Sequence, residues 1–223
     1  MALTPFAPDP TREAIAYHEA GHACHGALLK LHAGRVSIIP NSAGEDGRFY
    51  YGHAVFDPFP AWARRGSASP GRVQLLVQRH IGMLLAGEIA ETHYAGDAEG
   101  GRARAQSDRE RVYDLAGLVC RSSEEMDVYI AWLTVRTRRT VTGEISWLVI
   151  EAVATALLHH GTLSARAIRR TIAGAYQAMM APLLEQRGGI GHLTDPDHDG
   201  IRRDRGIPEL LDAADSATDE KMG

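Results

Sequence analysis

The feature that most constrains this chain is an alanine-rich segment that carries two histidines four positions apart, His18 and His22. Alanine has the highest helix propensity, so the segment predicts a helix. Asp9 followed by Pro10 is typical of a helix start, and we expect the helix to run from about there to about Lys30. Positions four apart lie one turn apart on the same helix face, so the two imidazoles can bind one zinc ion.

Glu19 stands next to the first histidine, about 100° around the helix. It therefore faces a water at the metal rather than the metal itself. A carboxylate there can take the proton of that water as general base and pass it to a leaving amine. The metal would lower the pKa of the water towards about 7 and polarise a scissile carbonyl. The pattern fixes only three positions, so a helix with two ordinary histidines is the alternative, which the strongly helical context disfavours.

A catalytic zinc site usually has three protein ligands and one open position. His18 and His22 supply two of them. No histidine in the spacing that marks metzincins follows His22, so the third ligand lies further along the chain. The candidates are Glu88, Glu91, His93, Asp97 and Asp108.

The rest of the pattern predicts a mainly α protein with a small β element, in one domain that spans residues 1–187. Residues 35–40 and 48–56 predict two strands that form a small hairpin after the first helix, the second of them at a sheet edge. The proline-rich stretch 57–71 is expected to be a loop. Further helices are expected at 72–94, after capping boxes that begin at Ser107 and Ser122, at 142–160 and at 164–187.

Residues 188–223 are rich in Asp, Arg, Gly and Pro, and we expect a polar C-terminal tail that is disordered in part. Within it, Asp195 to Gly200 has acids at positions 1, 3 and 5 of a calcium loop and a glycine at position 6. Position 12 is Gly206, where such a loop needs a bidentate glutamate. A solvated acidic turn is therefore favoured over a calcium site.

The net charge, the number of cysteines and the length of the longest apolar segment exclude several classes of protein. The net charge of -4 gives no case for a nucleic-acid partner, and the two cysteines make no disulfide framework. The N-terminus shows no signal-peptide pattern. The longest apolar run, 147–158, contains Glu151 and is shorter than the roughly 20 residues that a membrane span needs. We therefore expect a soluble cytoplasmic protein without a membrane span.

Residues 16–23, AYHEAGHA, resemble the zinc-binding helix of the peptidase domain of FtsH-type AAA proteases. The likeness extends over about residues 12–185, although only this first motif is specific by itself. RVSIIP at 35–40 resembles the strand after that helix, and AGEIAE at 86–91 stands where the family has a GGRxxE segment. AQSD at 105–108 resembles its GAxxD element, and residues 154–163 its late helix and Thr-Leu turn.

The resemblance implies a zincin-like helical peptidase domain in which Asp108 is the third zinc ligand and Glu19 is the catalytic base. Glu88 and Glu91 are the main alternatives to Asp108. The resemblance also implies a zinc-dependent endopeptidase that acts on flexible or unfolded polypeptides. In the family this domain is fused to an ATPase, which this sequence lacks, so activity is expected to be independent of ATP. A homo-oligomer or a separate ATPase partner stays open.

The family's Gly-Gly-Arg is replaced here by Ala86, Gly87 and Glu88. This departure leaves an alternative open, in which the chain is a catalytically silent, zinc-containing interaction or regulatory module derived from the same domain. Glu19 argues against it, because a purely structural metal site has no use for a base.

Overall fold

Helix α1 (Arg12–Leu28) occupies the middle of the computed structural model, which describes residues 11–40, 51–64, 69–96 and 105–188. The predicted first helix is confirmed. The N-cap expected at Asp9 is wrong, because Thr11 occupies that position. Its Oγ1 accepts a hydrogen bond from the backbone N–H of Ala14 at 3.1 Å, which satisfies one of the free donors of the first turn.

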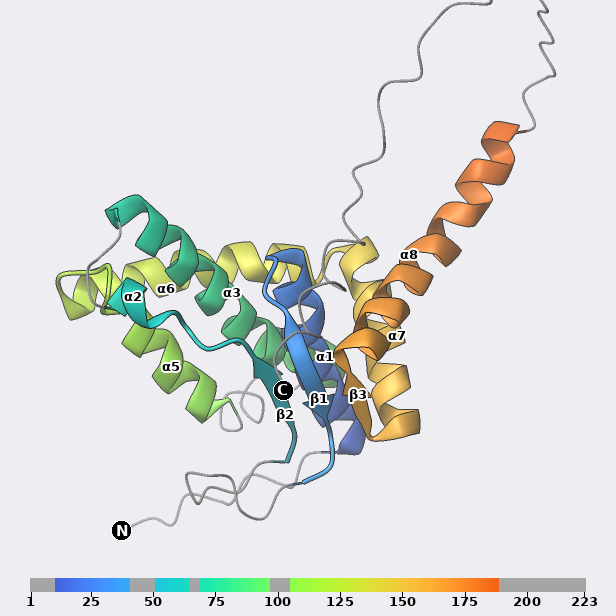
Figure 1. The fold of residues 1–223 in the computed structure, drawn as a ribbon, viewed down its shortest axis with the longest axis horizontal. Helices are drawn as coiled ribbons and strands as arrows, with labels where there is room; N and C mark the ends of the chain where they lie inside the picture. Colours follow the sequence, from blue (N-terminus) through green and yellow to red (C-terminus); the bar gives the residue numbers. More distant parts are fainter. Residues whose placement is uncertain (1–10, 41–50, 65–68, 97–104, 189–223) are drawn as a thin grey trace, which may run out of the picture. The chain divides into compact units, whose positions relative to one another are not determined.

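Three short strands form an antiparallel sheet in the order β2-β1-β3 (Figure 1). β1 (Ala33–Ser37) pairs with β2 (His53–Phe56), which confirms the expected hairpin and places β2 at a sheet edge. Both strands differ from their expected bounds. β1 begins at Ala33 and ends at Ser37, so residues 38–40 lie outside it, and β2 is shorter than expected, since residues 51 and 52 lie outside it. β3 (Thr162–Ser164) pairs with the other side of β1. The sequence does not indicate β3, because three residues are too few to show a period of two.

Helices supply most of the remaining structure, so the predicted mainly α fold with a small sheet is confirmed. Two details are wrong. The loop expected at 57–71 contains a short helix, which starts after Pro60 because proline is tolerated in a first turn. Ser107 is not an N-cap, because the helix already begins at the residue before it. The helices are α2 (Ala61–Arg64), α3 (Pro70–Ala95), α5 (Gln106–Ala116), α6 (Ser123–Val141), α7 (Glu144–His160) and α8 (Ala165–Gly188).

The capping box predicted at the start of α6 is confirmed. Ser122 Oγ accepts a hydrogen bond from the backbone N–H of Glu125 at 3.1 Å, and a carboxylate oxygen of Glu125 accepts one from the backbone N–H of Arg121 at 2.6 Å. Both contacts lie within five residues of sequence, which is why the local pattern suffices to predict them.

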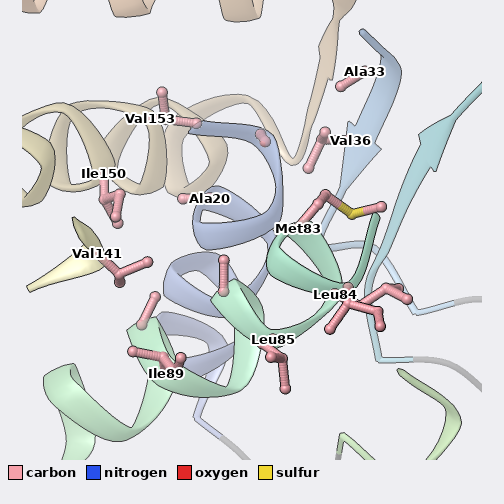
Figure 2. Close-up of a cluster of buried hydrophobic side chains, with 14 of the residues drawn as sticks. Ala20, Ala33, Val36, Met83, Leu84, Leu85, Ile89, Val141, Ile150 and Val153 are labelled. Carbon is pink, nitrogen blue, oxygen red and sulfur yellow. The ribbon is translucent and has the colours of Figure 1, made fainter. Parts of the chain in front are cut away.

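α1 packs between α3 and α7, with the sheet alongside (Figures 1 and 2). Figure 2 shows apolar side chains of all these elements around α1, among them Val36, Met83, Ile89, Ile150 and Val153.

The crossing of α1 and α3 is close because Gly21 has no side chain. A Cβ there would lie 2.5 Å from the carbonyl oxygen of Ala86 and 2.8 Å from Cβ of Ala90. The two histidines of α1 are thereby held directly against residues 83–91 of α3.

None of the described helices is by itself long and apolar enough to cross a membrane. α6 and α7 meet the criteria of length and composition only as a pair, which is bent by 77° at the break between them. The residues of the predicted tail beyond Gly188, the segment from Asp195 to Gly200 and the turn expected at 41–47 lie outside the described residues.

Candidate metal centre

Three side chains from two helices converge on one point: His18 and His22 from α1, and Asp108 from the first turn of α5. The Nε2 atoms of the two histidines lie 3.0 Å apart. Oδ2 of Asp108 lies 3.3 Å from Nε2 of His18 and 3.1 Å from Nε2 of His22. Ligands about 2.0–2.1 Å from a tetrahedral zinc ion stand roughly 3.3–3.4 Å from one another. The three atoms therefore nearly outline one face of such a tetrahedron.

The other ring nitrogens of both histidines are already engaged. Nδ1 of His22 lies 2.8 Å from the carbonyl oxygen of Met83, which can only accept, so this nitrogen carries the proton. Nδ1 of His18 lies 2.9 Å from a carboxylate oxygen of Glu91, a side chain that is only 1% exposed. In the neutral form that binds a metal, each imidazole therefore directs its Nε2 lone pair toward Asp108. A carboxylate or carbonyl behind the imidazole is the usual support of a metal-binding histidine.

The alternatives weighed for the third ligand lie elsewhere. Glu91 contacts the outer nitrogen of His18, not the side that faces Asp108. His93 packs edge-on against the ring of Trp147, with 4.4 Å between ring centroids. Asp97 lies outside the described residues.

Glu88 has a different partner again. Its carboxylate accepts two hydrogen bonds from the guanidinium of Arg109, at 2.8 and 2.7 Å. Arg109 is the neighbour of Asp108 on α5, so this bidentate pair ties α5 to α3 beside the site. We infer that Glu88 positions the helix that carries Asp108.

Gly87 supplies space that the two imidazoles need, a role that the sequence does not reveal. A Cβ at this position would collide with Nε2 of His22, would lie 2.6 Å from Cε1 of the same ring, and would lie 2.8 Å from Nε2 of His18. Gly87 and Glu91 are four residues apart, so they lie on one face of α3. A glycine one turn before an acid, in the mainly apolar half of the helix from 81 to 91, is the signal that could have indicated this face.

Glu19 lies in α1 next to the converging groups and is only 5% exposed. Its Oε2 is buried and finds no hydrogen-bond partner within the part of the chain that the structure describes. Burial raises the pKa of Glu19 to about 7, although the nearby imidazoles of His18 and His22 oppose the rise. Gly52 covers the other oxygen, since a Cβ on Gly52 would lie 2.8 Å from Oε1. An unpartnered buried carboxylate beside a donor cluster is typical of a functional site.

The charges of the cluster show how strongly it favours a cation. Burial by itself would lower the pKa of His18, but hydrogen bonds to Asp108 and Glu91 outweigh it and raise that pKa to about 10. Burial also favours the neutral form of Asp108, yet the imidazoles of His22 and His18 hold the pKa of its carboxyl below the ordinary value. The protein alone thus retains a proton at the place where the three donor atoms meet.

These observations fit a divalent metal ion. The donor set is two imidazoles and one carboxylate. Glu91 and the carbonyl oxygen of Met83 bind the Nδ1 atoms and thereby orient the two rings, and Gly87 has no side chain that would collide with them. The protein-family models and the curated proteins that were compared with this chain give no match, so its resemblance to FtsH-type peptidases stays an interpretation of the sequence motifs.

Proposed function

We propose that this chain is a zinc-dependent endopeptidase that hydrolyses peptide bonds in flexible or unfolded polypeptides without ATP. One observation carries the proposal. Nε2 of His18, Nε2 of His22 and Oδ2 of Asp108 lie 3.0–3.3 Å from one another, beside a buried carboxylate oxygen of Glu19 that has no partner among the described residues.

In this proposal His18, His22 and Asp108 hold the zinc ion. When bound, zinc supplies a Lewis acid that activates water and polarises the scissile carbonyl. Two histidines and one carboxylate are also the donor set of non-haem iron(II) oxygenases. Oε2 of Glu19 stands beside the site without a partner among the described residues, and this favours hydrolysis, because oxygen chemistry at iron does not need such a base.

Glu19 is the general base. Its Oε2 takes a proton from the attacking water and later delivers it to the leaving amine. A pKa of about 7 for Glu19 in the metal-free protein would make this transfer easy in both directions. A bound cation would shift the balance toward the carboxylate form, which is the form that accepts the proton.

The sheet supports a polypeptide as substrate. β2 is an edge strand, and Gly52, the residue just before it, lies against the carboxylate of Glu19. Among the described residues no strand pairs with the outer edge of β2, and an extended peptide that adds there by backbone hydrogen bonds would therefore run beside the proposed base. Recognition through the backbone tolerates many sequences, provided that the substrate is not folded.

The test is cleavage of an unfolded, fluorescently labelled protein by the zinc-loaded chain. We expect turnover by the wild type, and loss of at least about a hundredfold for Glu19→Gln, because one general base contributes roughly that much. Glu19→Gln should still bind one zinc ion per chain. Equal cleavage by both proteins would refute the role of Glu19, and cleavage supported by iron(II) but not by zinc would refute the metal assignment.

The silent zinc module is the second candidate function. It is favoured by the burial of Glu19, at 5% exposure, and by the close cover from Gly52, because a substrate must reach this carboxylate to be cut. Zinc bound tightly by the wild type and by Glu19→Gln, with no cleavage of any unfolded substrate by either protein, would favour the module over the peptidase.

A further inference from the structure

α6 has two apolar faces, and only one of them is covered. The inner face, with Leu133, Thr137 and Val141, is buried against the rest of the fold. On the outer face Val128 is 68% exposed and Val135 is 65% exposed. Trp132, between them, is 44% exposed. These three residues follow a spacing of four and three, so they form a straight apolar stripe along the helix.

Charges flank this stripe in an ordered way. The first half of α6 carries the exposed acids Glu124, Glu125 and Asp127, and the second half carries the exposed bases Arg136, Arg138 and Arg139. The midpoint between the two groups falls between Ala131 and Trp132. Counted from that midpoint, Val128 and Val135 are equally distant, and so are Glu124 and Arg139. The outer face is thus acidic at one end, apolar in the middle and basic at the other end.

We propose that this outer face of α6, residues 124–139, binds the same face of a second copy of the chain, with the two helices antiparallel about a two-fold axis near Ala131 and Trp132. In that arrangement Val128 faces Val135 of the second copy, and the two Trp132 rings meet beside the axis. The acidic half of each helix faces the basic half of the other. A symmetric interface must be complementary to itself, and this face is.

The charge order is what points to a second copy rather than to another partner. A parallel pair would place acid against acid and base against base, which is unfavourable. Arg136 already lies over the ring of Trp132, with its guanidinium carbon 4.7 Å from the ring centroid, so the aromatic centre is flanked by a cation that an acid of the second copy can meet. Val128 and Trp132 of the stripe also line a shallow hollow that can receive side chains of the other helix; its other lining residues are Ser122, Glu124, Glu125 and Tyr129.

A single helix pair is small beside a standard protein interface, so we expect a reversible dimer that dissociates on dilution. The measurement is sedimentation of the full chain over about a hundredfold range of concentration. We expect the mass to rise from that of one chain, 24.2 kDa, to twice that value. Val128→Glu should weaken the dimer at least tenfold, and Leu28→Glu, which changes an equally apolar residue that is 54% exposed on α1, should not.

A charge exchange tests the antiparallel geometry itself. One variant carries Glu124→Arg and Asp127→Arg, and the other carries Arg139→Glu and Arg136→Glu, the residues that face those two positions across the proposed axis. We expect each variant to be monomeric alone and the equimolar mixture to form a heterodimer, with circular dichroism showing that both are folded. The proposal is overturned if the wild type stays monomeric at every concentration, if Val128→Glu dimerises as well as the wild type, or if the mixture of folded variants gives no heterodimer.

Discussion

Gly87→Ala is a demanding test of the candidate metal centre, because it removes no ligand. The added Cβ would lie 2.6 Å from Cε1 of His22, where such contacts do not fall below about 3.0 Å, so the ring must move by at least about 0.4 Å. Metal–ligand distances vary by only about 0.2 Å. Moving either ring also disturbs its buried Nδ1 hydrogen bond, to Met83 or to Glu91, at roughly 1–3 kcal/mol each.

We therefore expect Gly87→Ala to lower the zinc affinity by at least about a hundredfold, measured by competition with a chromophoric chelator. The matched control is Gly174→Ala, a glycine inside α8 with nothing within 4 Å of the added Cβ. That change should leave zinc binding intact and stabilise the chain by up to about 1 kcal/mol, as alanine does in an open helix. If Gly87→Ala binds zinc as the wild type does and is stabilised like the control, a Cβ at this position does not displace the two imidazoles, and the reasoning is refuted.

Two further predictions concern buried titratable groups on α1 and α3. Glu91→Gln keeps an acceptor for Nδ1 of His18 but removes the charge behind it, and we expect roughly 10–100-fold weaker zinc binding in the chelator competition; unchanged affinity would show that this carboxylate does not support the ligand. His25 is only 7% exposed, and burial lowers its pKa to about 4 from an ordinary value near 6.5. The neutral form is therefore favoured by folding, so stability present above pH 6.5 is lost as the pH falls towards 4. His25→Gln should reduce that loss by up to roughly 3 kcal/mol in urea unfolding at the two pH values, and equal acid sensitivity of both proteins would contradict this account.

The sequence is informative where structure depends on near neighbours. The helix that carries His18 and His22 was predictable because alanine propensity acts within the helix, and the cap at Ser122 was predictable because its contacts are local. The segment that begins at Ser107 has the same Ser-x-x-Glu pattern, but Ser107 is not an N-cap, because the helix starts one residue before it. A short pattern thus predicts the presence of a helix better than its first residue.

The supports of the site depend on contacts between distant segments. The contact of Glu91 with His18 spans 73 positions, and the fit of Gly87 against both rings exists only because α1 and α3 cross closely at Gly21. The sequence motif names Glu91 as a candidate ligand, but only the packed helices show that it stands behind His18. The same holds for β3, whose three residues form a strand only because they pair with β1.

We propose above all that His18, His22 and Asp108 together bind one zinc ion. X-ray absorption spectroscopy of the zinc-loaded chain, with metal content measured on the same sample, tests it most directly. We predict one zinc ion per chain with nitrogen and oxygen ligands at about 2.0–2.1 Å, two of them imidazoles, and no bound zinc in His18→Ala/His22→Ala. Less than stoichiometric zinc in the wild type, or the same spectrum from that double variant, would contradict the account.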